Sequence, residues 1–229
     1  MKTARSSALR QYILRWVLFV LVAGGTLPAA AEMLSDGRAL NPASPLARYL
    51  FSQDFLREMY EAAVKMDRAL SITCNDQYTI QSVDLIVVTP IDFPEGATHA
   101  ASGEWVQRYD AVRCGTSKRF NMIFAAQPDG TTRSRMLLPG NTMASLRLMV
   151  DTIPMVSVVG ATELGKDCRD MMVADTAVAQ GPHAVTEDGK TTEGVWIENW
   201  TVQGCGKEMV ARVTFTPDGK GGAHIAVSK

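Results

Sequence analysis

The sequence of 229 residues predicts an α+β fold in which one module, a helix packed on an antiparallel sheet of three or four strands, occurs twice in tandem. Three observations support this expectation: residues that recur at a constant distance, an even number of cysteines in matching contexts, and two hairpins with the same turn residues. The recurring residues lie about 91 positions apart. They are Trp105, Tyr109, Cys114, Gly115 and Phe124 in the first copy and Trp196, Trp200, Cys205, Gly206 and Phe215 in the second. We expect copies at 52–138 and 143–229, related by an approximate twofold axis, in either one continuous sheet or two small lobes.

The first 31 residues have the pattern of a secretory signal peptide. Four basic residues and no acidic one precede an apolar run of about ten residues, half of the roughly 20 that a membrane-spanning helix needs. Three alanines, ending at Ala31, follow the run. We therefore expect cleavage near Ala31 and a mature periplasmic or secreted protein without a membrane span. Cleavage changes the formal charge from −1 to −5, which argues against nucleic-acid binding.

The four cysteines are expected to form two disulfides, because an exported chain with an even number of cysteines is typically oxidised. Their contexts match in pairs: Leu70-x-x-x-Cys74 resembles Leu164-x-x-x-Cys168, and Cys114 and Cys205 both precede glycine. We therefore expect Cys74–Cys114 and Cys168–Cys205, one in each copy. No histidine lies at ligand spacing from a cysteine and there is no Cys-x-x-Cys motif, so no metal site is expected.

The first copy is expected to begin with a helix after an irregular leader at 32–51. Apolar residues from position 55 onward follow spacings of three and four, with Ser52 or Asp54 as the N-cap. The apolar face contains Phe55, Met59, Ala63, Met66 and Leu70, and the polar face, expected to be solvated, contains Arg57, Glu61, Lys65 and Asp67.

Strands are expected at 78–88 and from Trp105, and in the second copy near 171–178 and from Trp196. Because side chains alternate along a strand, Trp105 shares a face with Gln107, Tyr109 and Ala111, and Trp196 shares one with Glu198, Trp200 and Val202. Large aromatic residues on a strand usually belong to the core, and a sugar or peptide platform is the second interpretation.

Each copy is expected to end in a hairpin with a three-residue loop, Pro128-Asp129-Gly130 and Pro217-Asp218-Gly219, whose glycine adopts a positive φ. This register sorts the residues by face. Phe120, Met122 and Phe124 share one face with Ser134, Met136 and Leu138, and Ala211, Val213 and Phe215 share one with Ala223, Ile225 and Val227.

The helix of the second copy is expected to start at Asn141–Ser145 and to carry Leu146, Met149, Val150 and Ile153 along its apolar side. Pro154 should end or kink it, and the apolar run at 155–159 is compatible with helix or strand.

The sequence contains none of the common catalytic motifs, which argues against an enzyme, and no cofactor is expected. The sequence lacks Gly-x-Ser-x-Gly, Ser-x-x-Lys, His-Glu-x-x-His and a phosphate-binding glycine loop. His99, His183 and His224 each stand apart from the other titratable residues that could form a site with them.

Charge is the one asymmetric feature, because 105–147 carries seven basic and two acidic residues. Arg119, Arg133 and Arg135 are expected to lie together on the outer face of the first hairpin and are the candidate ligand-binding residues. The alternative is that these arginines are solvated and protect a strand edge from aggregation. We expect an exported, non-enzymatic binding or accessory module for an envelope protein, the cell wall or an anionic ligand. The other interpretations are a periplasmic hydrolase-like enzyme with residues from separate loops and a structural subunit of an envelope assembly.

Overall fold

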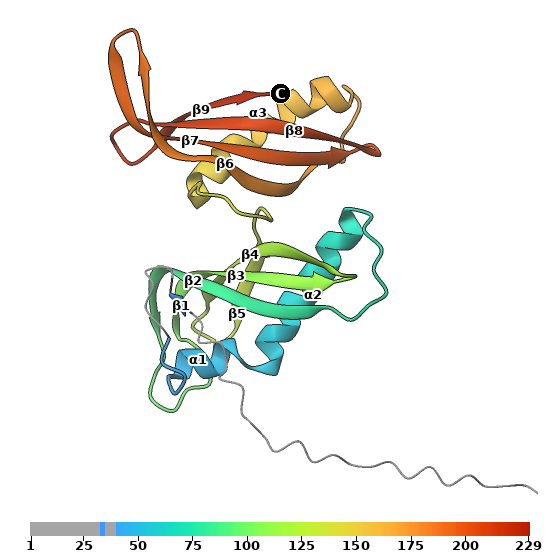
Figure 1. The fold of residues 1–229 in the computed structure, drawn as a ribbon. Helices are drawn as coiled ribbons and strands as arrows, with labels where there is room; N and C mark the ends of the chain where they lie inside the picture. The colour runs from blue at the N-terminus through green and yellow to red at the C-terminus, as the bar shows by residue number, and fades with distance from the viewer. Residues whose placement is uncertain (1–32, 35–39) are drawn as a thin grey trace, which may run out of the picture. The chain divides into compact units, whose positions relative to one another are not determined.

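The computed structural model describes residues 33–34 and 40–229 (Figure 1). The expected signal peptide at 1–31 lies outside these described residues. Among the helices described, none is long and apolar enough to cross a membrane. The fold is mixed α+β with a majority of β structure, arranged as two separate sheets.

The first sheet has the strand order β1-β2-β3-β4-β5, and helix α2 packs against it (Figure 1). The two-residue strand β1 runs parallel to β2, whereas β2 to β5 are antiparallel. The elements are β1 (Met33–Leu34), α1 (Pro45–Leu50), α2 (Gln53–Ala69), β2 (Thr79–Asp92), β3 (Ser102–Arg113), β4 (Thr116–Ala126) and β5 (Thr132–Met136).

The second sheet is antiparallel, with the order β6-β7-β8-β9, and helix α3 packs against it (Figure 1). The elements are α3 (Leu146–Leu164), β6 (Met172–Glu187), β7 (Lys190–Gly204), β8 (Lys207–Pro217) and β9 (Ala223–Ser228). Each sheet therefore contains four consecutive antiparallel strands, at the upper end of the expected range.

Both expected disulfides are present, Cys74–Cys114 and Cys168–Cys205. Cys114-Gly115 and Cys205-Gly206 form the two-residue turns between β3 and β4 and between β7 and β8, and all four residues have positive φ. Two consecutive positive φ angles are what a type I′ hairpin requires. The glycine after each cysteine is therefore explained by the turn.

The predicted amphipathic helix is α2, which Ser52 caps by accepting a hydrogen bond from the Phe55 N–H. Phe55, Met59 and Ala63 are fully buried against the sheet, as the periodicity indicates. Asp67, expected on the solvated face, is instead completely buried. The cause is an ion pair that no local pattern reveals.

The aromatic faces of β3 and β7 belong to the cores, which confirms the first of the two interpretations. Trp105, Gln107, Tyr109 and Ala111 are buried under α2, and Glu198, Trp200 and Val202 are buried in the second core. Trp196 is half-buried and stacks on Phe215.

Helix α3 continues through Pro154 to Leu164, so the run at 155–159 is helical. Its buried positions are Thr152, Val156, Gly160 and Leu164, whereas Val150 and Ile153 of the predicted apolar side are exposed. The helix has apolar residues nearly all round, and periodicity alone could not select the face that packs on the sheet.

The first hairpin has the predicted register, with Met122 opposite Met136 and Phe124 opposite Ser134 across the Pro128–Gly130 loop. The second hairpin keeps the predicted faces but not the predicted loop. Pro217 pairs with Ala223 and the Asp218 N–H donates to the Gly222 carbonyl, so the three-residue loop is Gly219–Gly221, two positions later than predicted. A displacement by an even number of residues leaves the face pattern unchanged because side chains alternate with period two, and Asp218 stabilises the loop by accepting from the Lys220 and Gly222 N–H groups. Gly130 and Gly219 both have the expected positive φ.

Within the described part of the leader, residues 45–50 form a helix and not the expected irregular segment. Helix α1 begins with Pro45 at its first turn, and the Ser44 hydroxyl accepts from the Ala47 N–H. Serine followed by proline is a signal for the start of a helix, but a helix of six residues is too short to show a clear apolar periodicity.

Candidate functional site

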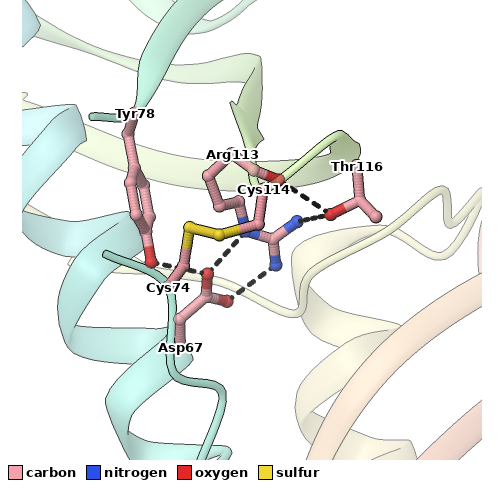
Figure 2. Close-up of a disulfide and its surroundings, with 6 residues drawn as sticks. All are labelled: Asp67, Cys74, Tyr78, Arg113, Cys114 and Thr116. Atoms are coloured by element: carbon pink, nitrogen blue, oxygen red, sulfur yellow. Dashed lines mark hydrogen bonds and ion pairs between the residues drawn. A yellow bond between two sulfur atoms is a disulfide. The ribbon is translucent and has the colours of Figure 1, made fainter. Parts of the chain in front are cut away.

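A polar cluster beside the Cys74–Cys114 disulfide is the most buried charged group of the first module (Figure 2). Arg113 at the end of β3 donates from Nε and Nη2 to the two carboxylate oxygens of Asp67 on α2, at 2.6 and 3.0 Å. Tyr78 Oη donates to the same carboxylate at 3.0 Å, and Arg113 Nη1 donates to Thr116 Oγ1 at 3.0 Å. These bonds to Asp67 raise the pKa of Arg113, and burial raises the pKa of Tyr78. The cluster is internally satisfied and joins α2 to the turn, which is a structural task.

Aspartates lie close to both disulfides, Asp76 beside Cys74–Cys114 and Asp170 beside Cys168–Cys205. Thiolates bind metals, but the four sulfurs are consumed in disulfides. In the second group the Asp170 carboxylate accepts from the Cys205 N–H at 3.3 Å. The Asp170 carboxylate therefore stabilises the turn at Cys205 through a main-chain hydrogen bond.

Of the three arginines expected to cluster, Arg119 lies apart from the other two. Its Nε and Nη2 donate to Asp110 at 2.6 and 3.0 Å, and its Nη1 donates to Asn141 at 2.9 Å. These bonds to Asp110 raise the pKa of Arg119. Strand β5 ends at Met136 before it reaches the level of Arg119, and the chain then crosses beside β4, where the Gly140 N–H donates to the Arg119 carbonyl.

Arg133 and Arg135 lie together on β5, on the face opposite α2. Both side chains are exposed, and no ion pair in the described part of the chain involves either of them. Their paired partners on β4 are Ala125 and Ile123, which offer no charge. The two guanidinium groups are therefore available to a carboxylate or another anion.

Strand β5 is also the last strand of its sheet, so no other described strand pairs with its outer edge, and Met172 of β6 lies near its Met136 end. The Gln127 N–H donates to the Thr131 carbonyl at one end of the β4–β5 ladder, and the Leu137 N–H donates to the Asn121 carbonyl at the other. Hydrogen-bonded and non-hydrogen-bonded pairs alternate in an antiparallel ladder, so the main-chain groups of Arg133 and Arg135 point toward β4. Those of Thr132, Ser134 and Met136 point toward the open edge.

A groove runs between β5 and helix α2, with a volume of about 480 Å³. Its lining is mostly apolar, with Lys65 contributing a cation from α2; Arg135 also borders the groove, although strand alternation places its side chain on the opposite face of β5. Glu58 on α2 closes one end by accepting a hydrogen bond from the Ser134 hydroxyl. The groove is lined by Ala62, Lys65, Met66, Ala69, Met122, Ser134, Arg135, Met136 and Met172.

We refer to β5 with the α2 residues Ala62, Lys65, Met66 and Ala69 as the β5 surface. Sequence reasoning found Arg133 and Arg135 from local charge but assigned Met66 to the core and Lys65 to a solvated face. These residues of β5 and α2 lie together because β5 is the last strand of its sheet, and strand order has no local signal in the sequence.

Comparison with known proteins places no family on this chain: no family model, no curated protein and no solved structure matches it.

Proposed function

We propose that the chain is an exported, non-enzymatic binding or accessory module that recognises an envelope protein through the β5 surface. The observation that carries the proposal is the combination of two exposed arginines without an ion pair, an outer strand edge that no other described strand pairs with, and a mostly apolar groove bordered by Lys65. Exposed apolar surface bordered by charge is typical of a protein-binding site. Methionine suits such a groove because its flexible thioether adapts to different side chains.

Binding is favoured over catalysis by the way three buried or partly buried ion pairs are used. Asp67 pairs with Arg113, Asp84 with Arg108 and Asp110 with Arg119. Catalysis requires titratable groups that converge on a space where a substrate fits. These side chains converge on one another instead.

Export and duplication belong to the same proposal. Two disulfides suit an oxidising compartment, and the N-terminal sequence has the features of a signal peptide. Duplication is supported by the common order of one long helix and four strands, by disulfides that close loops of 40 and 37 residues, and by an aspartate two positions after both Cys74 and Cys168.

Site-specific photocrosslinking tests the proposed function. A crosslinker placed at Ser134 should capture a discrete protein from envelope extract, whereas one at Arg212, an exposed strand residue of the second module, should not. The adduct should weaken at high salt, because exposed charges are screened, and should disappear with Arg133→Glu and Arg135→Glu. The proposal fails if both positions give the same adducts or if charge reversal leaves the Ser134 adduct unchanged.

A further inference from the structure

We propose that the segment recognised at the β5 surface binds as an additional β-strand next to β5, with side chains that alternate between apolar and acidic. This inference rests on the proposed function, because it specifies the partner of the same surface. Its support comes from the main chain, the two faces and the ends of β5.

The main-chain groups of Thr132, Ser134 and Met136 point toward the open edge, as the bonds at both ends of the β4–β5 ladder require. Within the described residues, no backbone hydrogen bond joins these three residues to another element. An extended segment satisfies such groups by continuing the ladder, which is the basis of strand addition. A helix in the groove would not, since its own N–H and C=O groups bond internally.

The two faces of β5 favour different side chains on the added strand. A neighbouring strand lies about 4.8 Å away, and its side chains line up with those of β5 on each face. Side chains beside Ser134 and Met136 would enter the apolar groove, next to Met66 and Ala69. Side chains beside Arg133 and Arg135 would meet two guanidinium groups, which bind carboxylates in bidentate geometry. The matching segment therefore reads apolar, acidic, apolar, acidic, apolar over the five residues of β5.

The ends of the groove distinguish the apolar positions. The Glu58 carboxylate bonded to Ser134 favours a small side chain there, whereas the groove near Met136 is lined by apolar atoms of Met66 and of Met172 on β6. A large apolar residue fits beside Met136.

One of the two edge strands of the second sheet, β9, provides the contrast within the same molecule. On the outer face of β9 lie His224, Ala226 and Ser228, which offer no pair of fixed positive charges. Its inner face carries Ile225 and Val227, which pack into the core with α3. An acidic strand therefore fits β5 and not β9.

The experiment uses the full mature chain and a fluorescent peptide with a Val-Glu-Val-Glu-Val core and serine flanks. A peptide of the same composition with a Glu-Glu-Val-Val-Val core is the control for order. We expect the alternating peptide to bind at least about tenfold more tightly, because the block peptide cannot present both faces at once. Equal affinities would overturn strand addition.

N-methylation of the peptide tests the main-chain bonds directly. One version carries methyl groups on the valine amides and the other on the glutamate amides. Only one of these sets can face β5, so one version should lose binding and the other should keep it. If methylation of the valine amides abolishes binding, the peptide lies antiparallel to β5. If methylation of the glutamate amides abolishes binding, it lies parallel. If both versions bind equally, or both fail equally, the strand arrangement is wrong.

Protein variants locate the site. Arg133→Glu with Arg135→Glu should weaken peptide binding by at least about tenfold, because two attractive charge contacts become repulsive. Arg212→Glu, which reverses a strand arginine of the second module, should leave it unchanged. If the photocrosslinked partner is captured but the alternating peptide binds no better than the block peptide, this inference fails and the proposed function stands. If neither partner nor peptide binds, both fail.

Discussion

The two modules place a disulfide at the same hairpin turn but differ in what packs beside it. In the first module Arg113 precedes Cys114 and forms a buried ion pair with Asp67, and Arg113 is only 6% exposed (Figure 2). In the second module Gly204 precedes Cys205, and an added Cβ there would lie 3.0 Å from Cys168 Sγ and 2.9 Å from Met171 Cγ. One turn is therefore joined to its helix by charge as well as by sulfur, whereas the other has space for no side chain at all.

A second pair of positions teaches the same lesson. Glu198 on β7 is 0% exposed, and its carboxylate accepts from the indole groups of Trp196 and Trp200 at 3.0 and 2.8 Å. It also accepts from Thr142 Oγ1 and from the Met143 N–H. Gln107 occupies the corresponding place on β3 and instead donates from Nε2 to Ser82 Oγ and to the Asp84 carbonyl. A buried acid is found where donors converge, and an amide where acceptors are present.

The largest expected effect is removal of either disulfide. For loops of 40 and 37 residues, loop closure predicts a loss of about 4 kcal/mol from each. The two variants should nevertheless differ locally. With Cys74→Ser and Cys114→Ser the buried Asp67–Arg113 ion pair still joins helix and turn, whereas Cys168→Ser and Cys205→Ser leave only the weaker bond from Lys207 Nζ to the Leu164 carbonyl, at 3.3 Å. Amide hydrogen exchange should therefore become faster over more residues around the β7–β8 turn than around the β3–β4 turn. An equal number of affected residues at the two turns would contradict the comparison.

The next effect is loss of the ion pair. Arg113→Ala should destabilise the protein by about 3 kcal/mol, because it leaves the Asp67 carboxylate buried without its partner. Denaturant unfolding measures the loss. The double change Asp67→Leu with Arg113→Met is the informative control, since it removes both charges and should cost less than Arg113→Ala alone. A double variant that is less stable than the single one would show that the pair contributes more than the cost of its desolvation.

A smaller effect concerns the two Pro-Asp-Gly loops. Gly130 and Gly219 have φ of 81° and 73°, so Gly130→Val and Gly219→Val should each lose about 1–2 kcal/mol. Lys220→Val should change stability little, because Lys220 does not have a positive φ. Melting temperatures that are equal for Gly219→Val and Lys220→Val would contradict the assigned loop conformation.

The smallest effect is a pH dependence shared by the same loops. Hydrogen bonds from Thr131 hold the pKa of Asp129 below its ordinary value of 3.8, and the Lys220 and Gly222 N–H groups do the same for the pKa of Asp218. A depressed pKa means that the folded state favours the charged form. The contribution is therefore present above pH 3.8 and is lost as the pH falls through the lower folded pKa. NMR titration of the two carboxylates measures it, and Asp129→Asn and Asp218→Asn should each remove one part of the acid-dependent change.

The hairpins show how far sequence reasoning reaches. The faces of both were predicted correctly, because alternation is a local rule that depends only on parity. The position of the second loop was predicted wrongly because Gly219, Gly221 and Gly222 allow more than one turn, and bonds to Asp218 decide between them. The buried face of helix α3 was predicted wrongly for a related reason. A helix with apolar residues nearly all round has no unique buried face that periodicity could identify.

The sequence by itself determined the α+β class, the helix α2, the aromatic core faces and both disulfide pairs, because each depends on periodicity or on a repeated local context. The tertiary structure alone decided that Asp67 is buried with Arg113, that Arg119 pairs with Asp110 away from Arg133 and Arg135, and that β5 forms an open edge beside an apolar groove. These are meetings between residues far apart in the chain. The free energy of such a contact depends on strand order and on which face of a helix packs, and neither is encoded within the few residues that a local pattern covers.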